Sequence, residues 1–88
     1  MNNYKLYYEQ LYVLDSFIVK PIDFEYLAVY KKSLQRLDLH RFSFNEITCC
    51  ELILLKGILL NFYKNEFITT ATYLDYLNCI ACIENSKN

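Results

Sequence analysis

One glycine and one proline in 88 residues leave this chain few places where it can turn sharply. Hairpin turns draw heavily on glycine, so the composition disfavours a fold of many β-strands. Glycine-rich phosphate loops are excluded, because their motifs need two or more glycines. The chain must be built from long elements with few breaks. At this length we expect one small domain, residues 1–88.

Apolar residues recur at helical spacing in four segments. The first segment runs from Asn3 to about Val19 and ends before Pro21, whose ring blocks a continuing helix. The second begins after Asp23, a residue type that caps helix N-termini. It carries the most regular apolar stripe, formed by Leu27, Tyr30, Leu34 and Leu37.

The third segment begins with the capping-box sequence Ser43-Phe44-Asn45-Glu46 and runs to about Lys64. Its polar residues are scattered around the helix, which is typical of a helix that lies centrally or in an interface. The fourth runs from Thr69 or Thr72 to about Glu84, and its threonines leave open that it is partly extended. Residues 85–88 are predicted to form a disordered tail.

Four helices with short connections predict an all-α, antiparallel, up-and-down bundle. That topology gathers all the cysteines at one pole: Cys49, Cys50, Cys79 and Cys82. Adjacent cysteines on a helix point about 100° apart, which is poor geometry for one zinc ion. The CxxC pair lies near a helix C-terminus, where the helix dipole disfavours a thiolate. We therefore expect small core residues in a reducing compartment, with no metal and no cofactor.

The sequence carries no pattern that predicts catalysis. His40 is the only histidine, and no pair of carboxylates is spaced for acid–base chemistry. We also expect no signal peptide, because Glu9 and Asp15 interrupt the first apolar stretch. Its longest apolar run contains Lys56 and is far shorter than the roughly 20 residues that span a bilayer. We expect a cytoplasmic protein that is not an enzyme and does not enter a membrane.

Two groups of residues are candidates for binding a partner. Basic and aromatic side chains interleave at Tyr26, Tyr30, Lys31, Lys32, Arg36, His40 and Arg41, and a tyrosine stripe on the first helix is formed by Tyr4, Tyr8 and Tyr12. Such a mixture suits a protein hot spot or unpaired bases. The net charge of −1 favours a protein or protein–RNA partner over free nucleic acid. With nine tyrosines, the chain has more apolar helix surface than one small core requires, which indicates a partner or a homodimer.

These observations predict a non-catalytic binding protein that inhibits or regulates a larger protein or ribonucleoprotein. Residues with A/T-rich codons (Asn, Ile, Lys, Tyr) far outnumber those with G/C-rich codons, which indicates a low-GC source such as a phage or mobile element. In size and in its lack of catalytic motifs the chain resembles anti-defence proteins of the anti-CRISPR type, although no shared motif supports the resemblance. The alternatives are an immunity protein or antitoxin, and a small homodimeric helical regulator that binds RNA or DNA.

Overall fold

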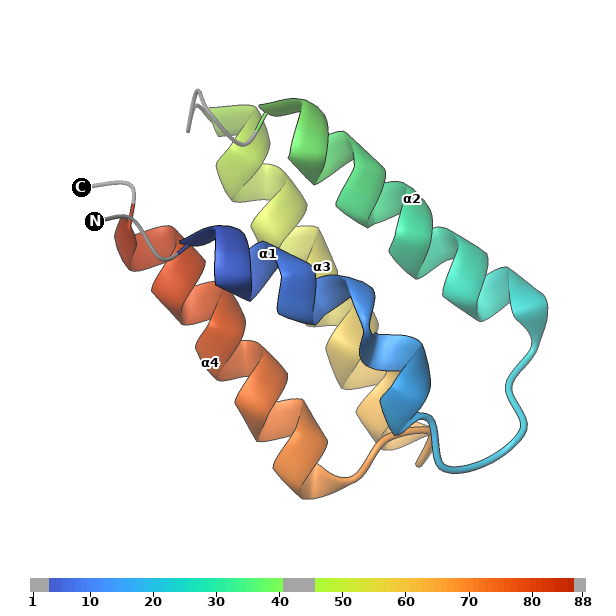
Figure 1. Cartoon of the computed structure of the whole chain (residues 1–88). Helices are drawn as coiled ribbons and strands as arrows, with labels where there is room; N and C mark the ends of the chain where they lie inside the picture. The colour runs from blue at the N-terminus through green and yellow to red at the C-terminus, as the bar shows by residue number, and fades with distance from the viewer. Residues whose placement is uncertain (1–3, 41–45, 87–88) are drawn as a thin grey trace.

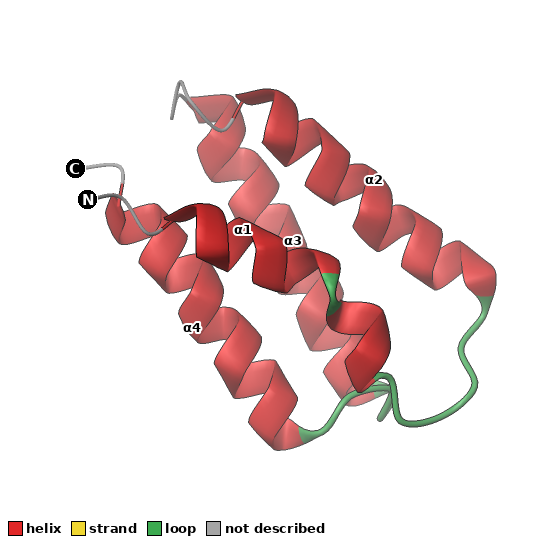
Figure 2. Cartoon of the chain, viewed as in Figure 1, coloured by secondary structure: helices red, strands yellow, loops and turns green. Residues whose placement is uncertain are grey.

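The computed structural model describes residues 4–40 and 46–86, with side chains for residues 6–39 and 49–85. In chain order they form α1 (Tyr4–Tyr12), a short 3-10 helix η1 (Leu14–Phe17), α2 (Phe24–His40), α3 (Glu46–Lys64) and α4 (Thr70–Ser86). Successive α-helices run in opposite directions (Figure 1). The described residues contain no strand (Figure 2). The predicted all-α antiparallel bundle is therefore confirmed.

The helices pack in an order that differs from their order in the sequence. α4 packs against both α1 and α3, α3 packs against α2, and α1 has a smaller contact with α2. In Figure 1, α1 lies in front of α3. The molecule measures 37 × 23 × 17 Å along its principal axes, so its thinnest dimension holds about two layers of helices. α3 consequently has a side that no other described helix covers.

The core is formed by apolar side chains from all four α-helices, from η1 and from the connection between α3 and α4. It comprises Tyr8, Leu11, Leu14, Tyr30, Leu34, Leu37, Leu52, Leu55, Leu59, Phe62, Phe67, Ile68, Tyr76, Ile80 and Ile83. The apolar stripe predicted for the second segment is confirmed, because its tyrosine and two of its leucines are buried and Leu27 packs against them. Phe67 and Ile68 belong to the connection, so this loop is part of the core rather than a loose link.

The prediction of one continuous first helix to Val19 is wrong. The α-helix ends at Tyr12, and the chain then tightens into η1. The Val13 N–H donates to the carbonyl of Gln10, three residues back, at 3.2 Å. Valine, aspartate and serine, which occupy positions 13, 15 and 16, are poorer helix formers than leucine. The tighter turn is compatible with a fully buried Leu14.

The starts of the later helices agree with the capping residues in the sequence. α2 begins directly after Asp23, and α3 begins at Glu46, the last residue of the predicted capping box, whose other residues lie outside the described ranges. At α4 the Oγ1 atom of Thr69 accepts a hydrogen bond from the Thr72 N–H at 3.2 Å. Because Thr69 caps the helix in this way, the segment is helical from Thr70, and the partly extended alternative is wrong.

The predicted tail is also shorter than expected. α4 continues to Ser86, so the first two residues of the predicted tail, 85–86, are helical. Asparagine and serine are modest helix formers, but neither glycine nor proline stands there to end the helix. Residues 87–88 lie outside the described part of the chain.

The C-terminus of α3 is a Schellman motif built without glycine. The Phe67 N–H donates to the carbonyl of Phe62 at 2.9 Å, and the Glu66 N–H donates to the carbonyl of Tyr63 at 3.0 Å. The rings of Phe62 and Phe67 meet edge to face at 6.0 Å, which is the apolar contact that accompanies this motif. Glu66 occupies the left-handed position with a φ of 63°, where glycine is usual. The motif turns Phe67 into the core at the expense of backbone strain in Glu66.

Replacing Glu66 with glycine should stabilise the protein. We expect Glu66→Gly to raise the free energy of unfolding by about 1 kcal/mol, because only glycine adopts this φ without a Cβ penalty. Urea titration followed by circular dichroism measures the change. The control is Glu66→Ala, which removes the same carboxylate but keeps the Cβ and should give no such gain. Equal effects from the two substitutions would show that the gain does not come from the backbone.

Candidate functional site

Two buried tyrosines hold the end of α1 in the bundle. The Tyr30 hydroxyl on α2 donates a hydrogen bond to the carbonyl of Leu11. The Tyr76 hydroxyl on α4 donates to the carbonyl of Gln10 at 2.8 Å. Both carbonyls lie in the last turn of α1, where the α-helical hydrogen bonds end; the Gln10 carbonyl also accepts from the Val13 N–H, so Tyr76 is its second donor. These tyrosines are therefore structural, although the sequence suggested a binding role for Tyr30.

Of the ten residues predicted to bind a partner, two are buried, and three have side chains outside the described residues and stay predictions. Tyr8 and Tyr30 are only 2% and 1% exposed, so a partner cannot reach them in this conformation. The side chains of Tyr4 and His40, and the whole of Arg41, lie outside the described residues. The other five are exposed, but they lie on different sides of the bundle.

Tyr12 and Lys31 lie on the side formed by α1, η1 and α2. The Tyr12 hydroxyl donates to Oδ2 of Asp38 at 2.9 Å. The Lys31 Nζ lies 2.9 Å from Oδ2 of Asp15, and both side chains of this pair are about half exposed. Val13, next to Tyr12, is also exposed. We call these five residues the α1–α2 face; it combines a hydrogen-bonded aromatic ring with one cation and two carboxylates.

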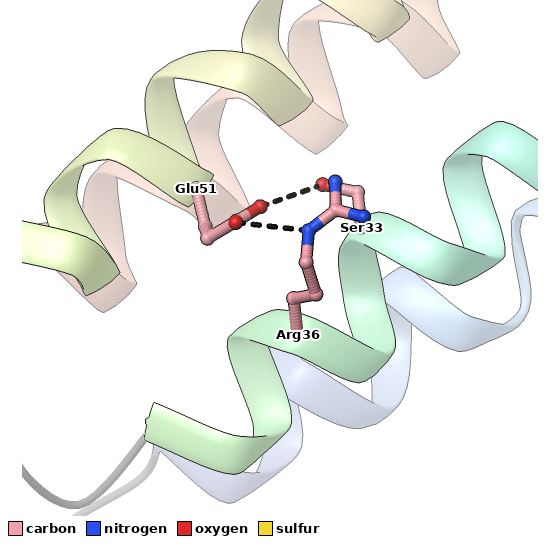
Figure 3. Close-up of polar contacts among 3 residues, drawn as sticks. All are labelled: Ser33, Arg36 and Glu51. Carbon is pink, nitrogen blue, oxygen red and sulfur yellow. Dashed lines mark hydrogen bonds and ion pairs between the residues drawn. The ribbon is translucent and has the colours of Figure 1, made fainter.

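Arg36 lies on the opposite side of α2 and contacts α3 (Figure 3). Its Nε donates to Oε1 of Glu51 at 2.9 Å, while the Ser33 hydroxyl donates to Oε2 of the same carboxylate at 3.4 Å. Ser33 is fully buried, so Glu51 provides a partner for a polar group that water cannot reach. The predicted basic segment is therefore divided: Lys31 pairs with η1, Arg36 pairs with α3, and Lys32 is exposed.

An apolar groove of about 490 Å³ runs along the outer side of α2 and α3. The α2–α3 face is defined by the exposed residues that line the groove, together with the exposed leucine one turn beyond Gly57: Tyr26, Val29, Ile53, Leu54, Gly57, Asn61 and Leu60. Ile53 is 63% exposed and Val29 is 54% exposed, so no described residue covers them. Apart from Tyr26, the sequence did not single out these residues. Two features of the third segment could have predicted an exposed apolar surface there: it lacks a polar side, and it has a glycine near its centre.

The cysteines of the CxxC pair lie beside α1. The hydrogen bond between the Tyr7 hydroxyl and Cys82, together with the nearby thiols, raises the pKa of Tyr7. Burial, Cys82 and Asp75 raise the pKa of the Cys79 thiol. Cys49, Cys79 and Cys82 are half-buried, whereas Cys50 is exposed on α3. A raised thiol pKa favours the protonated form, which is the opposite of an activated nucleophile.

Comparisons with known protein families, with curated proteins and with solved structures found no match for the chain. Within residues 4–40 and 46–86, no three side chains of His, Cys, Asp or Glu gather closely enough to hold a metal ion. The same ranges contain no helix that is long and apolar enough to cross a membrane. A function for the candidate surfaces must therefore be inferred from the positions and chemistry of their residues.

Alkaline pH should weaken the clamp on α1. Burial raises the pKa of Tyr76 to about 12 and raises that of Tyr30 further. An unfolded tyrosine releases its proton near pH 10, whereas the folded state retains it, so stability must fall as the pH rises from 10 toward 12. The variant Tyr76→Phe should be about 1 kcal/mol less stable than wild type at pH 8, because it loses one hydrogen bond.

The difference between wild type and Tyr76→Phe should shrink by about 1 kcal/mol between pH 8 and pH 11, since only wild type carries the hydroxyl that ionises on unfolding. Urea titrations of both proteins at the two pH values measure it. A difference that stays constant with pH would contradict the role assigned to Tyr76.

Proposed function

We propose that this chain is a non-catalytic helical binding protein that inhibits or regulates a larger protein or ribonucleoprotein. The proposed class is that of small anti-defence proteins from phages and mobile elements, of which the anti-CRISPR type is an example. In this proposal the chain works by covering a surface of its target, in the cytoplasm, without a cofactor.

The observation that carries the proposal is the amount of apolar surface outside the core. The described residues expose about as many large apolar side chains as they bury. Single exposed apolar residues are normal in small proteins, but contiguous ones mark interaction sites. The exposed residues include Tyr12 and Val13 on the α1–α2 face and a separate group on the α2–α3 face. Packing of the core does not explain these exposed apolar side chains, whereas contact with a partner does.

The α1–α2 face is our candidate for the contact with the target. Tyr12 is held by its hydrogen bond to Asp38, so little side-chain freedom is lost when a partner covers it. Tyrosine is enriched among the residues that contribute most to protein interfaces. The Asp15–Lys31 pair beside it offers both a donor and an acceptor to a protein surface.

The alternative of a nucleic-acid regulator is less well supported by the arrangement of charges. Lys31 and Arg36 each lie 2.9 Å from a carboxylate oxygen of the same chain. A phosphate would have to compete with Asp15 and Glu51 for these cations, whereas nucleic-acid sites gather cations on one face. An immunity protein or antitoxin remains the second protein-binding alternative, although such proteins are often more acidic than this chain, whose net charge is −1.

Affinity capture from a low-GC bacterial host and its phages tests the proposal. The bait is the full chain, used with and without nuclease treatment, and we expect one dominant larger protein that survives the nuclease. The variant Lys31→Ala should reduce its yield several-fold, because the variant removes a cation from the α1–α2 face. Lys64→Ala is the matched control, since Lys64 is exposed at the end of α3 and makes no ion pair within the described residues.

The outcomes separate the surface from the function. Equal losses from the lysine variants would refute the assignment of the α1–α2 face while leaving the binding function in place. Capture of nucleic acid alone, or of nothing, would refute the proposed function itself.

A further inference from the structure

Gly57 lies in the middle of α3, and no contact among the described residues accounts for a glycine there. Glycine in a helix interior costs about 1 kcal/mol relative to alanine. Gly57 has no positive φ, and a Cβ built on it would meet no atom within 4 Å. Neither backbone strain nor crowding inside the bundle therefore requires glycine here. A helix from outside the chain that approaches α3 closely would benefit from the missing side chain.

Two leucines are placed symmetrically about Gly57, although Ile53, four residues before it, is matched by the polar Asn61 four residues after it. Leu54 precedes it by three residues and Leu60 follows it by three, and both are exposed. The charged residues of this part of α3 are Glu51 and Lys56, and each pairs within the bundle, with Arg36 and Glu84. If the α3 helix of a second copy packed antiparallel against this one, Leu54 of each copy would lie at the same height as Leu60 of the other.

The charges on α2 fit the same arrangement. Glu25 and Lys32 are exposed and make no ion pair within the described residues. They lie at i and i+7 on the side of α2 that carries Val29, the residue that lines the groove opposite Gly57. In an antiparallel pair of α2 helices, each glutamate meets the lysine of the other copy. The charge pattern is therefore complementary to itself.

A single twofold axis satisfies both contacts. The ion pair between Arg36 and Glu51 places these two residues at about the same height along the bundle. Because α2 and α3 are antiparallel and rise equally per residue, counting seven residues back from Arg36 and seven forward from Glu51 places Val29 at the height of the residue after Gly57. The midpoint between Glu25 and Lys32, about which an antiparallel pair of α2 helices would be centred, lies within about one residue of Val29. An axis that crosses α2 and α3 there relates α2 to α2 and α3 to α3. This is the isologous geometry of a twofold dimer.

We propose that the α2–α3 face binds a second copy of this chain, in an antiparallel twofold dimer centred on Gly57. The dimer goes beyond the proposed function, and it leaves the α1–α2 face open for a target. In the dimer the exposed apolar side chains of α3 leave water, and Glu25 pairs with Lys32 of the second copy.

Multi-angle light scattering and sedimentation of the purified chain, over a wide range of concentrations, test this proposal. The expected mass is twice the 10.6 kDa of the chain. Gly57→Leu should weaken self-association by about tenfold or more, because the added side chain separates the two α3 helices. The same variant should raise the urea midpoint of the monomer, since leucine is a better helix former and its Cβ meets no atom within 4 Å. Weaker association with a more stable monomer excludes misfolding as the cause.

The charge pair provides the second readout. Glu25→Lys and Lys32→Glu should each weaken the dimer by about tenfold, since each juxtaposes like charges, and the double variant should restore it. A monomeric wild type at every concentration would overturn the dimer. So would a Gly57→Leu variant that associates normally, or a double variant that fails to recover. A monomer whose Gly57→Leu variant loses a captured target would instead assign the face to that target. Because self-association needs only the purified chain, its failure is distinct from failure of target capture.

Discussion

The hydrogen bonds from Tyr30 and Tyr76 to the end of α1 are the contacts on which the rest of the arrangement depends. Each hydroxyl comes from a different helix, and the two acceptors are adjacent carbonyls, so together they fix both the position and the direction of α1. The same contacts provide donors for carbonyls in the last turn of α1, where the α-helical hydrogen bonds end. With α1 held in this way, η1 can turn Leu14 into the core, and the bundle closes around two aromatic side chains that are also hydrogen-bond donors.

Helical spacing and the residue types at the helix ends were enough to predict the fold class, the stripe on α2 and the start of α2 after Asp23. It was not enough for the end of α1, because the hydroxyls that bind the carbonyls of Leu11 and Gln10 lie 19 and 66 residues away from them along the chain. Nor could spacing show that Thr69, rather than Thr72, caps α4. Both are acceptable caps, and only the geometry of the preceding loop selects between them.

The candidate surfaces were harder to predict than the fold. A run of basic residues reads as one patch in sequence, but Lys31 and Arg36 lie on opposite sides of α2 and each has a different helix's carboxylate as its partner. Tyrosine misled for a related reason. Its hydroxyl permits burial where a carbonyl is within reach, as it is for Tyr30 and Tyr76, and Tyr8 is also part of the interior. The surface that is apolar without an internal partner is made chiefly of leucine, isoleucine and valine, whose exposure depends on which side of α3 has no neighbour.

Because α1 packs against α4, the order in which the chain connects the helices could be changed by circular permutation. These helices are antiparallel neighbours, so Tyr4 and Ser86, at the beginning of one and the end of the other, lie at the same end of the bundle (Figure 1). A short peptide could join them and let the backbone be opened elsewhere, as in circular permutation. A permuted chain would keep all the helix contacts described above. The linear order of the four helices is therefore one of several that this bundle could accept.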